Sequence, residues 1–497
     1  MLNLISDRWI PVLRRSGFDT IRPDQIVEPD VLRLDWPRPD LNLACLELLI
    51  GMVYLARPPR GRDDRFSPPD PQELRQALEP LAPAFDLLGD GPRFLQDLEP
   101  LEGRESPPEM LFIDSAGDST AKKNADLMVR RARYESLPLP LAAMALYTLQ
   151  AFAPSGGAGN RTSMRGGGPM VALVKPPAEG LGELVWANVP TGEPLSASNL
   201  DELPWMRPTH TSKPIGKHAP TRIPPVGNSP LRCHPEVFFG QPRRLRLVAR
   251  GDAITAVVQQ PWGTNYEGWK HPLTPYYGNG AGTLPRRPKP GSFSYPDWKG
   301  VILASETGQR PATLLRHLRD IKGARCSLIV AGWVMDNMKP LDFLWSEQPV
   351  FPLSEEGEGN AERAVQAAEQ VGYAVSVCVR DGVGESDRTS GAGKRAQEAF
   401  FAATQGAFEE MLESLSSGAP FAAKTWLASM RNAAVGVFDR EVMPGLSDLG
   451  EKRRQKAVEA RSKLIADFAG LTKFSKRIFD PLGLELPARP SRRPRQG

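Results

Sequence analysis

The strongest constraint on the fold of this chain is a change in composition near residue 355. Before that point, short apolar runs alternate with proline and glycine and no helical periodicity is sustained, which is typical of an α+β domain with long loops. After it, alanine, glutamate, lysine and arginine dominate. Because 497 residues exceed what one hydrophobic core usually serves, we expect more than one domain. The predicted fold class is therefore α+β, with a large mixed domain over residues 1–355 and an all-α four-helix bundle over residues 360–480.

The bundle is predicted from helical periodicity. Four segments, joined by Gly, Ser or Pro breaks, follow the boundary at residues 361–380, 394–416, 420–439 and 450–470. The last three each show one apolar face. In the fourth segment that face is formed by Ala457, Ala460, Leu464, Phe468 and Leu471. Such faces are typical of a four-helix bundle. Residues 487–497 contain four arginines among prolines, so we expect a disordered basic tail.

The first domain is expected to contain two apolar helices. One runs from Asp40 to Ala56, with Asp40 as its N-cap and Pro58 as its stop signal, and the other covers 141–152. Apolar and β-branched runs predict strands at Ile10–Leu13, Met170–Val174, Leu245–Val248 and Ala253–Val258. Long connections inside a compact domain are usually functional or mobile, and here they cover residues 114–133, 204–235 and 272–298.

Charge and motif content exclude several classes of function. A formal net charge of +4 does not indicate a protein that binds nucleic acid through its overall charge, so such a function would depend on local patches of positive charge. Four scattered cysteines, with Cys233 and His234 lacking a second pair nearby, support neither a zinc site nor a disulfide framework. No P-loop, dinucleotide fingerprint, nucleophile elbow or HExxH motif occurs. We therefore predict a non-enzymatic protein with no metal and no cofactor.

The chain shows no sign of membrane insertion or export. Asp7 and Arg8 stand where a signal peptide needs apolar residues, and no run of 18 apolar residues follows. We expect a cytoplasmic protein that does not bind a membrane.

One segment stands out as a candidate binding surface. The glycine segment, residues 155–169, reads SGGAGNRTSMRGGGP and contains six glycines, with Arg161 and Arg165 to supply positive charge. Glycine allows another molecule to approach the backbone closely, and the N–H groups of such a loop can point together at an anion. The alternative is a glycine-rich turn between a helix and a strand, and the spacing alone leaves both interpretations open.

Three other regions concentrate positive charge. The 114–133 connection contains Lys122, Lys123 and Asn124, followed by Arg130, Arg131 and Arg133. The 272–298 connection carries Arg286, Arg287 and Lys289, and the fourth bundle segment begins with Lys452, Arg453, Arg454 and Lys456. These side chains could neutralise phosphates without carrying sequence information. Solvated charged surfaces are the alternative.

Six separated motifs point to a known family. They are NLISDRWIPV, FIDSAGDSTAKKNAD, APSGGAGNRTSMRGGGP, GQPRRLRL, YEGWKHPLTPYY and GWVMDNMKPLDFLW. In this order the motifs resemble those of the CasA family, the large subunits of the type I-E CRISPR surveillance complex called Cascade. The resemblance covers nearly the whole chain and implies the two-part architecture derived above.

The resemblance implies an RNA-guided function. A CasA subunit joins the other Cascade subunits near the 5′ handle of the guide RNA and recognises the PAM, a short motif in double-stranded DNA, from the minor groove. The protein reads the PAM and guide pairing reads the target. The family also promotes strand separation, helps to hold the displaced strand and helps to recruit a helicase-nuclease.

The resemblance also implies roles for individual residues. The glycine loop, residues 156–161, corresponds to Gly156, Gly157, Ala158, Gly159, Asn160 and Arg161. A finger that enters the minor groove falls near Arg286, Arg287 and Lys289, and a wedge that parts the strands falls on Asn337, Met338 and Lys339. Contacts to the guide handle fall on Lys122, Lys123 and Asn124, and contacts to the displaced strand on Lys452, Arg453, Arg454 and Lys456. The paired cysteines of some members are replaced by Leu137–Pro140, so no metal site is carried over.

Two alternatives to a PAM-reading subunit stay open. One is an architectural ribonucleoprotein subunit whose loops contact only protein and RNA. The other is a nuclease or nucleotide hydrolase that uses the glycine segment to bind phosphate.

Overall fold

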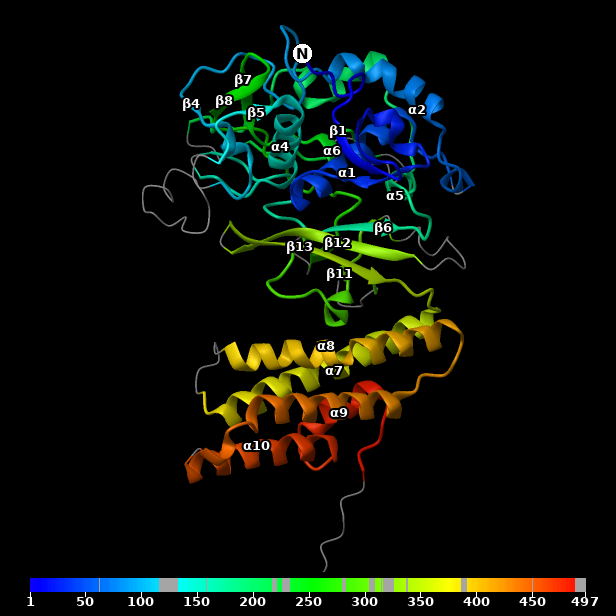
Figure 1. Ribbon diagram of the computed structural model, residues 1–497, viewed down its shortest axis with the longest axis vertical. Coiled ribbons are helices and arrows are strands. Elements are labelled where there is room, and N and C mark those ends of the chain that lie inside the picture. The colour runs from blue at the N-terminus through cyan, green and yellow to red at the C-terminus, as the bar shows by residue number, and fades with distance from the viewer. Residues whose placement is uncertain are drawn as a thin grey trace, which may run out of the picture. The chain divides into compact units, whose positions relative to one another are not determined.

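The computed structural model divides the chain into two compact units. Unit 1 comprises Met1–Pro290 and Arg310–Val350, and unit 2 comprises Gly291–Gln309 and Phe351–Gly497. The structure describes residues 1–61, 63–115, 133–157, 159–216, 221–225, 233–278, 283–303, 309–313, 315, 326–336, 338–385, 391–448 and 450–487. Mixed helix and strand content followed by a helical region confirms the predicted α+β class (Figure 1). Residues 291–309 belong to unit 2, although the sequence suggested that they form part of the first domain.

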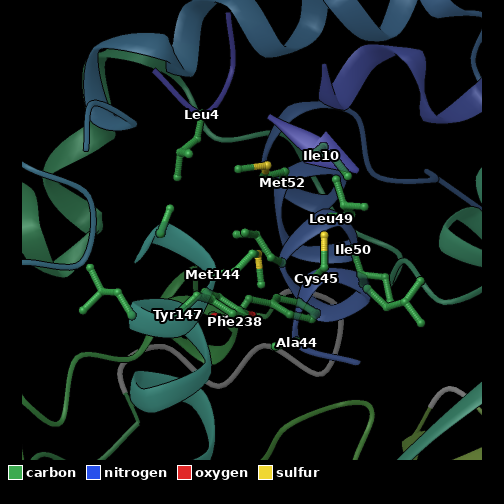
Figure 2. Packing of buried hydrophobic residues seen from close by; sticks show 14 of the residues in the cluster. Leu4, Ile10, Ala44, Cys45, Leu49, Ile50, Met52, Met144, Tyr147 and Phe238 are labelled. Carbon is green, nitrogen blue, oxygen red and sulfur yellow. Dashed lines mark hydrogen bonds between the residues drawn. The ribbon is translucent and has the colours of Figure 1, made fainter. Parts of the chain in front are cut away.

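The core of unit 1 is built around helix α1 (Pro39–Ala56), which is buried on all sides. It packs against α4 (Leu139–Phe152), and Figure 2 shows Met52 and Cys45 of α1 beside Met144 of α4. By length and composition α1 could cross a membrane, but 89% of it is buried inside the fold. It is therefore the core helix. The predicted N-cap, Asp40, is wrong, because α1 begins after Arg38 and Asp40 lies in the first turn of the helix. The Asp40 carboxylate accepts hydrogen bonds from the Arg38 guanidinium at 2.9 and 3.0 Å.

Short helices and small antiparallel sheets surround this core (Figure 1). The other α-helices in the described part of unit 1 are α2 (Pro71–Leu78), α5 (Leu181–Ala187) and α6 (Glu236–Phe239). One sheet joins β1 (Ile10–Arg14) to β2 (Gly17–Ile21) and β3 (Val31–Leu34). In a second sheet, β8 (Ala253–Gln260) pairs with β7 (Arg244–Arg250), β4 (Glu105–Ser106) and β5 (Leu137–Pro138).

A third sheet carries the longest strands. Strands β12 (Ser327–Asp336) and β13 (Lys339–Pro349) form an antiparallel hairpin in which Asp336 pairs with Lys339, and β6 (Val171–Lys175) pairs with the other edge of β12. The glycine segment leads directly into β6. The end of the glycine segment therefore lies next to the sheet that contains the β12–β13 hairpin.

The 272–298 connection is more ordered than the sequence suggested. It contains a small hairpin of β9 (Tyr276–Gly278) and β10 (Thr283–Pro285), which β11 (Gln309–Arg310) extends. Strands of two or three residues have too few positions to show an alternating pattern, so they gave no signal in the sequence.

Unit 2 is the helical unit. Its helices are α7 (Glu355–Val383), α8 (Gly391–Ser416), α9 (Ala423–Val442), α10 (Glu451–Phe468) and α11 (Ser475–Phe479). Helices α7 to α10 pack on one another and correspond to the four predicted segments (Figure 1). Leu471 was assigned to the apolar face of the fourth segment but lies beyond the end of α10 and is 48% exposed.

Segment 291–309 contributes aromatic side chains to the core of this unit. Tyr295 stacks on Phe408 with ring centroids 4.4 Å apart, and its hydroxyl lies 2.9 Å from the hydroxyl oxygen of Thr404. Trp298 packs edge-on against the same Phe408 ring. These contacts explain why the segment belongs to unit 2.

Candidate nucleic-acid interface

Three segments that are far apart in the sequence meet in unit 1: the glycine segment, the predicted finger and the β12–β13 hairpin. A Cβ added to Gly167 would lie 3.0 Å from the sulfur of Met338, at the turn of the β12–β13 hairpin. A Cβ added to Gly166 would lie 3.1 Å from an Nη atom of Arg287, in the predicted finger. The side chains of the predicted wedge and finger thus contact the backbone of neighbouring glycines. Glycine is needed at position 167 because an added Cβ would lie 2.7 Å from Cα of Pro154, and at position 166 because φ is +75°.

Backbone contacts join the same three segments. The N–H of Met170, just after the glycine segment, donates to the carbonyl of Arg286 at 2.8 Å. A Cβ added to Gly332 on β12 would lie 2.5 Å from the carbonyl oxygen of Pro169 and 3.1 Å from Cγ of Pro288. The glycine segment, the predicted finger and the β12–β13 hairpin therefore pack closely together in unit 1.

The glycine loop itself forms an exposed tight turn. Gly156 and Gly157 are exposed, and Gly157 and Gly159 have φ of +66° and +83°. The N–H of Asn160 donates to the carbonyl of Gly157 at 2.7 Å, which closes the turn. A Cβ added to Gly157 would find no atom within 4 Å, so this glycine faces open space. Ala158 lies outside the described residues.

The base of the turn is held by strand β8 and the residues that follow it. Gln259 donates to the side-chain oxygen of Asn160 at 2.7 Å, and the N–H of Trp262 donates to the carbonyl of Gly159 at 2.9 Å. The Arg161 guanidinium lies 5.0 Å from the centroid of the Trp262 ring and donates through Nε to Ser212 at 2.8 Å. Asn160 therefore positions the turn, whereas Arg161 keeps its positive charge beside it.

Arg165 does not supply surface charge. Its guanidinium donates to both carboxylate oxygens of Glu47 on α1 at 2.7 Å, and the two side chains are 3% and 0% exposed. It also donates to the hydroxyl of Thr274 at 3.1 Å. Burial alone would lower the pKa of Arg165, but the Glu47 carboxylate raises it. The expectation that Arg165 supplies charge to a ligand surface is wrong, because a carboxylate 118 residues away neutralises it.

The other predicted DNA-contacting residues differ in exposure. Arg287, Lys289 and Lys339 are exposed, whereas Arg286 and Met338 are half-buried. Met338 has φ of +65°, a left-handed conformation that is uncommon for a residue with a side chain. Asn337 lies outside the described residues.

The structure describes only the ends of the 114–133 connection, which is predicted to contact the guide handle. Lys122, Lys123 and Asn124 lie outside the described residues. At the end of that connection, Arg133 pairs with Asp114 at 3.2 Å and lies over the Tyr134 ring. Arg38 holds the same Asp114 carboxylate at 3.1 Å. Asp114 and Arg133 therefore fix the two ends of the connection to unit 1.

The basic run of the fourth helix belongs to unit 2. Lys452, Arg453, Arg454 and Lys456 are all exposed in the first turns of α10. The Arg453 guanidinium covers Gly384, where an added Cβ would lie 2.8 Å from its Cζ. This run lies in unit 2, whereas the glycine segment lies in unit 1.

Several residues beside the glycine loop were not assigned any role from the sequence. Arg243, Gln259 and Trp262 support the turn, and only Arg243 falls within one of the quoted motifs. Their contacts are long-range, so no spacing rule could have revealed them.

The described residues contain no cluster of metal-ligating side chains. His234 accepts a hydrogen bond from the N–H of Glu236 at its Nδ1, and the carbonyl of Cys233 accepts one from the Tyr54 hydroxyl at 2.8 Å. These two residues have structural contacts in unit 1.

Comparison with known proteins gives a consistent result. Residues 3–437 match the family model described as CRISPR-associated protein Cse1. A structure of Thermus thermophilus CasA (Cse1) is 20% identical, with a TM-score of 0.70 over 96% of this chain and 99% of that one. A structure of Thermobifida fusca Cse1 is 18% identical, with a TM-score of 0.67 over 97% and 99%. A chain in a structure titled CRISPR RNA-guided surveillance complex is 15% identical, with a TM-score of 0.67 over 93% and 99%.

Proposed function

Because this chain belongs to the CRISPR-associated Cse1 (CasA) family, we propose that it is the large subunit of a type I-E RNA-guided surveillance complex and recognises the PAM in double-stranded DNA. In this proposal it reads the PAM from the minor groove and promotes separation of the strands for guide pairing. It acts by binding, without catalysis, cofactor or membrane, in the cytoplasm. Its partners are the other Cascade subunits, the guide RNA, the target duplex and a helicase-nuclease.

The observation that carries this proposal is that the predicted finger and wedge pack against the glycine segment, which also forms an exposed turn at Gly157. Gly157 projects backbone without a side chain, Arg287 supplies an exposed cation and Met338 supplies an apolar side chain. The minor groove of DNA is only about 6 Å wide, so a bare backbone is well suited to enter it. Minor-groove readout is degenerate, which predicts tolerance of several related PAM sequences.

Strand separation is assigned to the β12–β13 turn. Apolar side chains inserted between base steps unstack them at a cost of a few kcal/mol, which contacts to the opened DNA offset. Met338 is an apolar side chain at a hairpin turn, with Lys339 exposed beside it. We assign the wedge to Met338 together with Asn337 and Lys339.

The remaining contacts follow from charge. Lys122, Lys123 and Asn124 are proposed to contact the guide handle, and residues 452–456 the displaced strand. Cations in such positions neutralise phosphates and give salt-dependent affinity. Recruitment of the helicase-nuclease is proposed on family membership alone.

The glycine loop can be tested with a matched pair of variants in the assembled complex. Gly157 and Gly251 have φ of +66° and +64°, and an added Cβ meets nothing within 4 Å at either position. Gly251 lies in the β7–β8 turn, at the far end of β8 from Gln259 and the glycine loop. Replacement by leucine therefore introduces the same backbone strain at both sites, which makes Gly251→Leu the control.

The measurement determines the affinity of the complex for DNA duplexes whose target matches the guide and whose sequence at the PAM position is randomised. We expect Gly157→Leu to lower the affinity for PAM-containing duplexes by about ten-fold or more, whereas Gly251→Leu leaves it unchanged. Assembly on guide RNA should be normal for both variants. Equal affinity of the wild-type complex for duplexes with and without a PAM would favour the architectural alternative. Turnover of DNA, RNA or ATP that survives stringent purification would favour the enzymatic one.

A further inference from the structure

A buried arginine beneath the glycine loop has no counter-ion among the described residues. Arg243 is 6% exposed, and its Nη2 donates to the carbonyl of Pro154 at 2.5 Å. Its Nε has no hydrogen-bond partner among the described residues. A Cβ added to Gly156 would lie 2.8 Å from Nη1 of Arg243, so the guanidinium lies directly against the exposed turn.

Three other arginines of unit 1 that are buried or partly buried are neutralised by carboxylates. Arg165 pairs with Glu47, Arg38 with Asp40 and Asp114, and the adjacent Arg244 with Asp97 at 2.6 Å. No carboxylate of the described residues pairs with Arg243. Of the two arginines that are buried among the described residues of unit 1, Arg165 has a carboxylate partner and Arg243 has none.

A second arginine at the same turn is also unneutralised. Arg161 contacts the Trp262 ring and the Ser212 hydroxyl, and within the described part of the chain no carboxylate pairs with it. Trp262 packs against the turn as well, because a Cβ added to Gly159 would lie 2.8 Å from its ring. Two positive charges thus flank one short exposed turn.

Burial of a charge without a partner is costly, and proteins usually avoid it. Burial lowers the pKa of Arg243 to about 10 and also lowers that of Arg161, where the nearby Arg222 adds to the effect. Both side chains still carry a full positive charge at neutral pH. An anion bound at the turn would offset this cost.

We propose that Arg243 and Arg161 form a binding site for one backbone phosphate of duplex DNA at the base of the glycine loop. This inference rests on the proposed function. The backbone phosphate takes the place of the missing carboxylate and is approached by Arg161 and by the glycine backbone, with Arg243 supplying charge from beneath. The site adds affinity and fixes the position of the duplex, but it does not read bases.

The test measures salt dependence in the assembled complex. Affinity for a PAM-containing duplex is determined between about 50 and 200 mM salt for wild type, Arg243→Met, Arg243→Lys and Arg161→Gln. Methionine keeps most of the buried volume without the charge, and lysine keeps the charge. Arg250→Gln is the control, because Arg250 is exposed, lies at the far end of β7 and pairs with Glu105 at 2.9 Å.

We expect Arg243→Met and Arg161→Gln each to reduce the slope of log affinity against log salt, by up to about 0.9 for the loss of one phosphate contact. Arg243→Lys and Arg250→Gln should keep the wild-type slope. The ratio of affinities for duplexes with and without a PAM should not change, because a phosphate contact carries no sequence information.

Three results would overturn the inference while leaving the proposed function intact. The first is an unchanged slope in both charge-removing variants. The second is a selective loss of PAM discrimination, which would show that Arg243 only shapes the loop. The third is a changed salt dependence of guide-RNA loading in place of DNA binding, which would assign the charges to RNA. A wild-type complex that ignores the PAM would instead overturn the proposed function.

Discussion

The Glu47–Arg165 pair shows how one residue can anchor a binding segment to the core. Glu47 lies on the central helix and Arg165 lies in the glycine segment, and both side chains are fully withdrawn from solvent. A buried ion pair adds little net stability, but removal of one partner leaves an uncompensated charge inside the protein. The pair therefore fixes the position of the segment more than it stabilises the fold.

Glu47→Gln should lower the free energy of unfolding by about 3–5 kcal/mol, because the Arg165 charge stays buried without a carboxylate. The matched control is Glu347→Gln, which removes a carboxylate paired with Lys175 at 2.8 Å where both side chains are more than 40% exposed. That change should cost less than about 1 kcal/mol. Urea unfolding of both variants makes the comparison, and equal losses would contradict the anchoring role.

His271 makes the stability of the same region depend on pH. Burial lowers the pKa of its imidazole well below 6.5, and the Arg165 charge adds to this. The unfolded chain takes up a proton near pH 6.5 that the folded chain does not, so stability falls as the pH drops below that value. The slope contributed by one proton is at most about 1.4 kcal/mol per pH unit.

We expect the free energy of unfolding to decrease between about pH 7 and pH 5 in the wild type, and to decrease less in His271→Gln. Urea unfolding at constant ionic strength measures both profiles. The difference between the profiles isolates His271 from the carboxylates that titrate in the same range. Parallel profiles would show that His271 does not contribute.

At the scale of elements, the sequence predicted the long helices and strands β1, β6, β7 and β8, but it missed the two longest strands, β12 and β13, as well as the shortest ones. Periodic apolar residues predicted α1 and the last three bundle helices, whereas α4 was predicted from an apolar run and α7 from the change in composition. The β9–β10 hairpin was missed because each of its strands has only three residues. The glycine segment could be singled out from composition, whereas its packing against Met338 and Arg287 could not, because tertiary contacts decide it.

The turn of the β12–β13 hairpin combines strain with an apolar side chain. A left-handed φ costs a residue other than glycine roughly 1–3 kcal/mol, so Met338→Gly should leave the stability of the hairpin unchanged or raise it. The same change removes the proposed wedge. We expect opening of a matched duplex by the complex to slow by about ten-fold, measured with 2-aminopurine beside the PAM. A duplex that is already unpaired next to the PAM should open normally with the variant. Wild-type opening rates for Met338→Gly on fully paired DNA would exclude Met338 as the wedge.

At the scale of the whole molecule, the two units are not consecutive in the sequence. Unit 2 includes residues 291–309, and Tyr295 and Trp298 in that segment pack against Phe408. The sequence located the boundary near residue 355 because composition changes there. Segment 291–309 is short and lies in the sequence between two parts of unit 1, so its composition does not assign it to either unit. Its contacts assign it to unit 2.

This division predicts that a change at position 295 destabilises helices that lie more than fifty residues further along the chain. Replacement of a buried aromatic residue by alanine typically costs about 3–5 kcal/mol. Tyr295→Ala should therefore accelerate hydrogen–deuterium exchange in peptides from α7, α8 and α9 and leave those from α1 and α4 protected. Tyr147→Ala is the matched control, because Tyr147 is an equally buried tyrosine on α4 whose hydroxyl donates to the carbonyl of Phe238 at 3.1 Å. It should produce the opposite pattern. If Tyr295→Ala accelerated exchange mainly in α1 and α4, segment 291–309 would belong with unit 1, because a buried side chain stabilises the unit whose core it fills.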